Sequence, residues 1–147
     1  MGAYIQTSAG PLHWRDYGGS GEVILLVHGL GGSVANWDAV GPRLSDLGRT
    51  VALDLPGFGL SPPARDWELH THARAVHSFM SEFAPSATLI GNSMGVSLLK
   101  WLPLELPRPS TPSYSLHLPL PRGFQIRGFT GPPQDVWLCR QRRELAG

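Results

Sequence analysis

Runs of apolar residues separated by polar turns divide the first hundred residues into a regular series of expected elements. Residues 22–27 and 50–55 are nearly continuous apolar runs, as in strands buried within a parallel sheet. Residues 87–91 have the same character. Residues 3–7 and 12–17, separated by a Gly-Pro turn, predict an N-terminal hairpin.

Two helices are expected between these strands. The stronger follows a Pro-rich loop at 61–65, with Asp66 as N-cap and an end before Pro85. Its apolar stripe recurs at helical spacing and consists of Leu69, Ala73, Val76, Met80 and Phe83. The weaker covers 37–47, where Gly41-Pro42 would break or restart it. Strands alternating with helices predict a parallel sheet with right-handed crossovers.

A G-x-S-x-G segment, Gly91-Asn92-Ser93-Met94-Gly95, lies between the strand-like run at 87–91 and a helix-compatible run. A sharp strand-to-helix turn presents a serine hydroxyl, and glycines two positions away let neighbouring backbone approach. The alternative is a Gly-rich turn whose serine only caps a helix. The strand-like run before the motif favours the interpretation that its serine, Ser93, is a nucleophile.

The two earlier strands also end in glycine-rich turns. The first ends in His28-Gly29-Leu30-Gly31-Gly32-Ser33, and the second in Pro56-Gly57-Phe58-Gly59-Leu60-Ser61. Such turns expose backbone N–H groups, the donors that an acyl-transfer site needs where negative charge develops on a carbonyl oxygen.

These three segments, each a strand followed by a glycine-containing turn, together resemble the α/β-hydrolase family. The resemblance covers roughly residues 3 to 100 and corresponds to the N-terminal half of the family's fold. The resemblance implies an α/β fold with strand order 1-2-4-3-5, mostly parallel and with helices on both faces. It implies that Ser93 is the nucleophile. The backbone N–H of Met94 would form one half of the oxyanion hole. The N–H of Leu30 would form the other half, with that of Gly31 as the second choice. Support of the loops is expected from His28, Gly29, Gly31, Asp54, Gly91 and Gly95.

Serine at the elbow narrows the implied chemistry, because family branches that open epoxides or displace halide use aspartate there. Position 93 therefore indicates acyl transfer on an ester, amide or carbon–carbon bond of a small molecule. The resemblance implies a serine hydrolase, esterase- or lipase-like, with no cofactor. The alternative is an inactive truncated form that acts as a binding or interaction module.

The composition changes near residue 103, which suggests a division into 1–102, the hydrolase part, and 103–147, a Pro-rich, irregular tail. Residues 101–147 hold eight of the 14 prolines, and proline removes backbone donors. We expect a truncated product, or alternatively a purposeful proline-rich extension. The elbow strand would then be a bare sheet edge, through which the chain could self-associate.

This tail also raises the question of the catalytic base. Serine hydrolysis needs a histidine beside the serine and an acid that orients it, in the family order Ser, acid, His. Downstream of Ser93 the sequence has one histidine, His117, and Glu105 is the one acid between them. Asp135 with His117 would reverse the order. Neither Glu105 nor His117 follows a strand-like run, so we expect impaired activity.

Composition excludes several other classes. A net charge of +1 gives no case for nucleic acid, and no apolar run is long enough to span a bilayer. One cysteine, Cys139, cannot make an intramolecular disulfide or a zinc site. His70, His72 and His77 lack the i, i+4 spacing of a helical metal pair. No metal is expected, and the protein is expected to be cytoplasmic.

Overall fold

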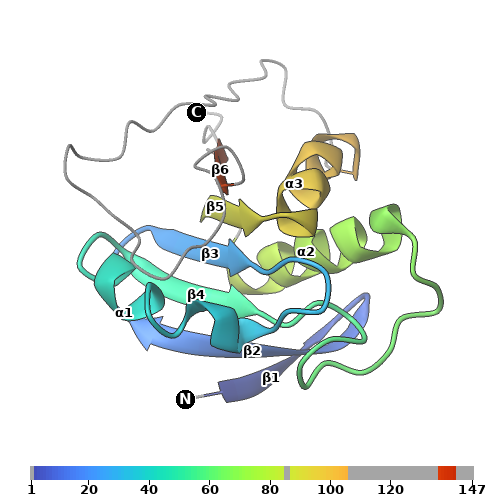
Figure 1. Ribbon diagram of the computed structural model, residues 1–147, viewed down its shortest axis with the longest axis horizontal. Coiled ribbons are helices and arrows are strands. Elements are labelled where there is room, and N and C mark those ends of the chain that lie inside the picture. The colour runs from blue at the N-terminus through green and yellow to red at the C-terminus, as the bar shows by residue number, and fades with distance from the viewer. Residues whose placement is uncertain (1, 85–86, 106–135, 142–147) are drawn as a thin grey trace.

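A computed structural model describes residues 2–84, 87–105 and 136–141, in which helices cover a twisted sheet (Figure 1). The sheet has six strands in these residues, in the order β1-β2-β4-β3-β5-β6. The strands are β1 (Gly2–Thr7), β2 (Gly10–Gly18), β3 (Val23–Val27), β4 (Arg49–Leu53), β5 (Ala87–Asn92) and β6 (Val136–Gln141). The helices are η1 (Val34–Trp37), α1 (Gly41–Leu44), α2 (Leu69–Phe83) and α3 (Met94–Glu105).

The predicted strand order 1-2-4-3-5 is confirmed. The strand β3 pairs in parallel with β4 on one side and with β5 on the other, as the continuous apolar runs indicate. The hairpin β1–β2 and the pair β2–β4 are antiparallel. The sheet is therefore mixed, and less parallel than predicted.

The expectation that β5 forms a bare sheet edge is wrong. The strand β6 pairs with β5 in antiparallel register, from Ala87↔Gln141 to Asn92↔Val136. The segment Val136-Trp137-Leu138-Cys139 contains no proline and has the apolar and aromatic character of a strand. Its pairing satisfies backbone groups along β5 that would otherwise remain open. The rest of the predicted tail from 106 onward lies outside the described residues.

The helix predicted over 37–47 is two separate short helices, η1 and α1. The hydroxyl of Ser33 accepts a hydrogen bond from the Ala35 N–H at 3.2 Å and caps η1. Pro42 lies in the first turn of α1, where its missing N–H costs nothing. Gly41-Pro42 therefore starts a new helix.

The helix α2 begins two residues later than an N-cap at Asp66 predicts, because its N-cap is Glu68. The Asp66 carboxylate accepts a hydrogen bond from the Glu68 N–H at 3.0 Å, which makes a turn before the helix rather than its cap. Glu68 is the N-cap and makes no side-chain capping bond. Ala73, Val76 and Met80 of the predicted stripe are buried, and Phe83 at its end is partly buried, whereas Leu69 at the start is 40% exposed.

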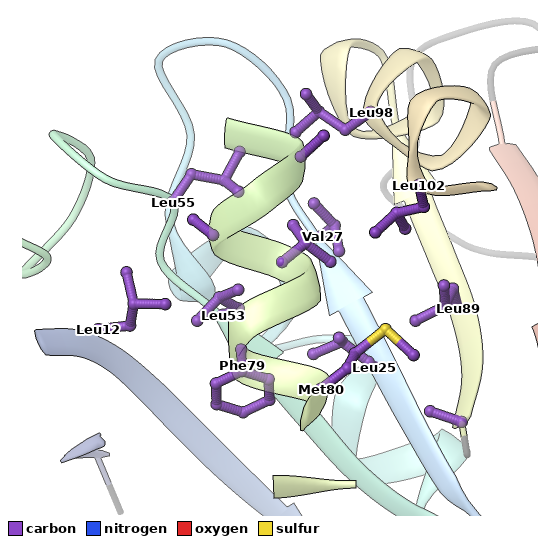
Figure 2. Packing of buried hydrophobic residues seen from close by; sticks show 14 of the residues in the cluster. Leu12, Leu25, Val27, Leu53, Leu55, Phe79, Met80, Leu89, Leu98 and Leu102 are labelled. Carbon is purple, nitrogen blue, oxygen red and sulfur yellow. The ribbon is translucent and has the colours of Figure 1, made fainter. Parts of the chain in front are cut away.

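Two hydrophobic clusters lie on opposite faces of the sheet. Leu25 and Val27 of β3 belong to the cluster under α2 and α3, and Ile24 and Leu26 to the cluster under η1 and α1. This alternation follows from the two-residue period of a strand. Figure 2 shows the larger cluster, in which Phe79 and the side chains around it fill the space between helix and sheet.

Candidate active site

Ser93 lies in the sharp turn between the end of β5 and the start of α3. It has φ = 52°, the only positive value among the non-glycine residues that the structure describes. A left-handed conformation costs a serine on the order of 1–3 kcal/mol, so the surrounding structure must impose it. The Ser93 carbonyl accepts from the Val96 N–H at 2.9 Å and so begins α3. The serine is exposed at the carboxyl edge of the sheet.

The two glycines of the motif are required by close backbone approach. A Cβ on Gly91 would lie 2.7 Å from the Gly95 carbonyl carbon, and one on Gly95 would lie 2.4 Å from the Val27 carbonyl oxygen. Both distances are shorter than any side chain accepts. Glycine at these positions therefore lets α3 start directly against β3 and β5.

The loop after β3 passes directly beside Ser93. A Cβ on Gly29 would lie 3.0 Å from Ser93 Cβ and 3.0 Å from the Asn92 carbonyl oxygen. Leu30, which follows Gly29, has a side chain that is 75% exposed. Gly31 has φ = 72° in the same loop. The structure thus places the loop of Leu30 beside the turn of Ser93 and Met94.

His28 is fully buried below this loop, and both of its ring nitrogens have partners. Its Nδ1 lies 2.7 Å from the Gly29 carbonyl oxygen and donates to it, and its Nε2 accepts from the Leu55 N–H at 3.0 Å. Burial lowers the pKa of His28. The neutral ring holds two loops together and has no nitrogen left to take a proton from Ser93.

Asp54 links three segments through its buried carboxylate. Oδ1 accepts from the Val34 N–H at 2.7 Å, and Oδ2 accepts from the Leu60 N–H at 2.9 Å. Oδ2 also accepts from His13 Nδ1 at 2.7 Å. The loops that follow β3 and β4 are therefore both fixed to one carboxylate and to β2.

The roles of His13 and Ser61 in this network are not apparent from the sequence. The Ser61 hydroxyl accepts from the His13 N–H at 2.8 Å and donates to the Asp54 carbonyl oxygen at 2.7 Å. His13 stands 41 residues from Asp54. No local pattern links positions that far apart.

The predicted base and acid are not brought to Ser93 in the described residues. His117 and Asp135 lie outside them. Glu105 is the last residue of α3, eleven positions after Met94, so a rise of 1.5 Å per residue places it about 16 Å along the helix. A triad acid must orient a base that touches the serine, and Glu105 starts too far from Ser93 for that.

The described residues contain no group of three side chains suited to a metal ion. His72 is buried, with its ring nitrogens 3.0 Å from the Glu68 carbonyl oxygen and 3.2 Å from that of Pro56. His70 pairs with the Glu68 carboxylate at 2.9 Å. Within the described ranges, every helix is too short or too polar to cross a membrane.

Comparison with known proteins places this geometry in context. The acetyltransferase component of the acetoin cleaving system of Cupriavidus necator is 35% identical over 130 residues, which cover 87% of this chain and 34% of that protein. The pimeloyl-[acyl-carrier protein] methyl ester esterase of Methylococcus capsulatus is 40% identical over 76 residues, covering 52% and 26%. An esterase structure from Exiguobacterium antarcticum superposes with a TM-score of 0.64 at 26% identity, covering 71% and 40%.

The chain thus spans about a quarter to a third of the length of the curated relatives it matches first. The sequence model of the alpha/beta hydrolase fold matches residues 22–107, more than half of the chain. This stretch runs from β3 through α3 and includes all three glycine-rich turns. With esterases and other hydrolases among its relatives, the chain belongs to the alpha/beta hydrolase fold family.

Proposed function

We propose that Ser93 is the nucleophile of an acyl-transfer site for an ester, amide or activated carbon–carbon bond of a small molecule. The observation that carries this proposal is the left-handed backbone of an exposed serine at the carboxyl edge of the sheet. Strain of that kind at a non-glycine residue is typical of functional sites. Cysteine and aspartate chemistry are excluded at this position by its identity.

In the proposed reaction, Ser93 Oγ bonds to the substrate's carbonyl carbon and its proton passes to a base. The bond to the leaving group then breaks, the leaving group takes up a proton, and water releases the acyl group from Ser93. The backbone N–H groups of Met94 and Leu30 would hold the negative oxygen. The close approach of Gly29 to Ser93 supports this, because it puts the loop that contains Leu30 beside the turn that contains Met94.

We further propose that this chain by itself is a weak catalyst. His28 has both ring nitrogens engaged, and His13 Nδ1 is bonded to Asp54. The one histidine after Ser93 in the sequence is His117. Loss of the base lowers turnover by several orders of magnitude in serine hydrolases, while the oxyanion donors retain part of the rate.

A fluorophosphonate probe tests both parts of the proposal. We expect slow covalent labelling of the folded chain that disappears in Ser93→Ala and is unchanged in Ser97→Ala, a serine one turn along α3. We expect His117→Ala to label as slowly as the parent chain. Labelling that persists in Ser93→Ala would overturn the nucleophile assignment. Fast, His117-dependent labelling would show instead that the chain has its own base.

The alternative of a non-catalytic binding module rested on an open edge at β5. The strand β6 pairs along that edge, so an open edge at β5 no longer supports a binding module. A folded chain that never labels, even at high probe concentration, would restore that alternative.

A further inference from the structure

Exposed apolar side chains gather at the edge of the sheet where Ser93 lies. Six large hydrophobic side chains are exposed among the described residues, and five of them lie at or beside this carboxyl edge. These five are Leu30 after β3, Leu60, Trp67 and Leu69 after β4, and Tyr4. The Tyr4 hydroxyl donates to the Leu60 carbonyl oxygen at 2.9 Å, which puts Tyr4 beside the loop after β4. The sixth, Leu47, precedes β4 and lies at the opposite edge.

Ring contacts connect the exposed Trp67 to the loop beside Ser93. The ring centroids of Trp67 and Phe58 are 5.7 Å apart, and those of Phe58 and His28 are 5.5 Å apart. His28 precedes Gly29, on which a Cβ would lie 3.0 Å from the Cβ of Ser93. Figure 1 shows the loops after β3 and β4 leaving the sheet on the same side. Ser93 and Trp67 therefore belong to one stretch of surface.

The loops around Ser93 expose no carboxylate, ammonium or guanidinium group. Segments 28–33, 54–64 and 92–95, all within the described residues, contain one Asp, Glu, Lys or Arg residue, Asp54. Its carboxylate is buried and accepts three hydrogen bonds. His28 is also buried, and burial lowers its pKa. A charged group on a ligand would find no counter-ion in these loops, whereas an apolar group would find apolar partners.

We propose that the acyl group of the substrate is a neutral, apolar chain that lies on Leu30 and extends along the loop after β4 toward Trp67. This inference rests on the proposed function, because it takes Ser93 as the nucleophile and the Leu30 N–H as an oxyanion donor. A donor of that kind lies about 3 Å from the oxyanion. The side chain of Leu30 is then only a few bonds from the substituents of the reacting carbon, and Leu30 selects among acyl groups.

Binding of methyl esters to the full chain carrying Ser93→Ala tests the apolar surface without any reaction. NMR shifts of the Leu30 amide and the Trp67 indole N–H follow each titration. We expect methyl hexanoate to bind at least about tenfold more tightly than methyl acetate, because it buries four more CH₂ groups. Monomethyl adipate has a chain of the same length that ends in a carboxylate. It should bind at least about tenfold more weakly than methyl hexanoate.

Two leucines supply the matched pair of variants in the same background. Leu30 is 75% exposed beside Ser93, and Leu47 is 69% exposed at the opposite edge. We expect Leu30→Ala to weaken binding of methyl hexanoate about fivefold, and Leu47→Ala to leave it unchanged. Trp67→Ala should weaken it by at least as much as Leu30→Ala. Cooperative melts check that each variant is folded.

Acylation of the parent chain by p-nitrophenyl esters, followed by mass spectrometry, tests the same preference in the reaction. Ser93 Oγ bonds to the acyl carbon, p-nitrophenolate leaves, and the hydroxyl proton passes to solvent. We expect hexanoate to react about tenfold faster than acetate, and Leu30→Ala, unlike Leu47→Ala, to reduce that ratio. Preserved binding preference without acylation by either ester would count against Ser93 as nucleophile and for the apolar surface.

Four results would overturn the proposal. They are equal binding of methyl hexanoate and methyl acetate, binding of monomethyl adipate as tight as that of methyl hexanoate, unchanged binding in Leu30→Ala, and an equal loss in Leu47→Ala. Unchanged binding in Trp67→Ala would overturn the direction of the acyl chain. Shifts at the same positions when protein concentration alone is raised would assign the surface to a second copy of the chain and would also overturn the proposal.

Discussion

The loops that leave the carboxyl ends of β4 and β5 lie at the same edge of the sheet but are fixed by different contacts. The turn after β5 is closed by main-chain contacts, since a Cβ on Gly91 or Gly95 would overlap backbone atoms. The loop after β4 is held by the carboxylate of Asp54, which accepts three hydrogen bonds. The turn after β5 is therefore closed by backbone against backbone, whereas the loop after β4 depends on one buried acceptor, and a Cβ on Gly59 would lie 2.2 Å from the carboxyl carbon of that same Asp54.

The largest effect is expected from adding one methyl group to the turn after β5. In Gly95→Ala the new carbon would lie 2.4 Å from the Val27 carbonyl oxygen, which belongs to the backbone and not to a flexible side chain. The gain in helix propensity is about 1 kcal/mol, so overpacking dominates and we expect a net loss of about 3 kcal/mol. Urea denaturation of Gly95→Ala measures this loss.

Ser97→Ala is the control for that experiment, because it also changes a small residue in the first turns of α3. We expect a change within about 0.5 kcal/mol. A Gly95→Ala variant as stable as the parent chain would show that the turn is less closed than its distances indicate.

The loop after β4 should be destabilised by a substitution that removes a hydrogen-bond acceptor and leaves the side-chain volume unchanged. In Asp54→Asn, the amide nitrogen must face either the Val34 N–H or the Leu60 N–H, so one buried donor loses its partner. Such a loss costs about 1–3 kcal/mol. We expect about 2 kcal/mol in urea denaturation.

Asp38→Asn is the matched control for Asp54→Asn. Asp38 also accepts from two side chains, those of Arg15 and Tyr17, but it is exposed, and surface pairs contribute at most about 1 kcal/mol. Equal losses in the two variants would mean that burial does not distinguish Asp54, and the contrast between the loops would fail.

The two ways of fixing a loop also differ in how far sequence can predict them. Steric closure is local, and the spacing of Gly91, Ser93 and Gly95 predicts the strand, the turn and the start of α3 within two residues. The polar network joins Asp54 to His13 across 41 residues, and the identity of neither residue indicates the other.

The same distinction explains the error at the sheet edge. The apolar segment that forms β6 is short, and its partner residues in β5 lie 44 or more positions earlier in the chain. The proline content of the surrounding residues concealed it. Elements fixed by contacts within a few residues could be predicted, and so could the strand order that the family resemblance implies. The distant pairing of β6, which neither local pattern nor resemblance indicates, could not.

His28 connects the two loops, and acidification should weaken that connection. Burial lowers its pKa below the ordinary 6.5, so below pH 6.5 the unfolded chain binds a proton that the folded chain does not. Its contribution to stability is complete above pH 6.5 and falls as the pH decreases toward the lowered value. The slope is at most about 1.4 kcal/mol per pH unit.

Thermal melts between pH 8 and pH 5 measure this slope against that of His28→Gln. Glutamine retains one donor and one acceptor but does not titrate in this range. We expect the variant to be less stable at pH 8 and to lose less stability on acidification. Parallel curves for the two proteins would show that His28 does not carry the pH dependence.

The smallest expected effect has the opposite sign and lies at the nucleophile. Ser93 is held at φ = 52°, a conformation that glycine adopts without strain. Ser93→Gly should therefore stabilise the chain by about 1 kcal/mol, offset in part by the greater entropy of glycine in the unfolded state. Ser93→Ala keeps the Cβ and the strain, so it should not stabilise. If Ser93→Gly is less stable than Ser93→Ala, the strain at the elbow is negligible, and the argument from strain to function loses its basis.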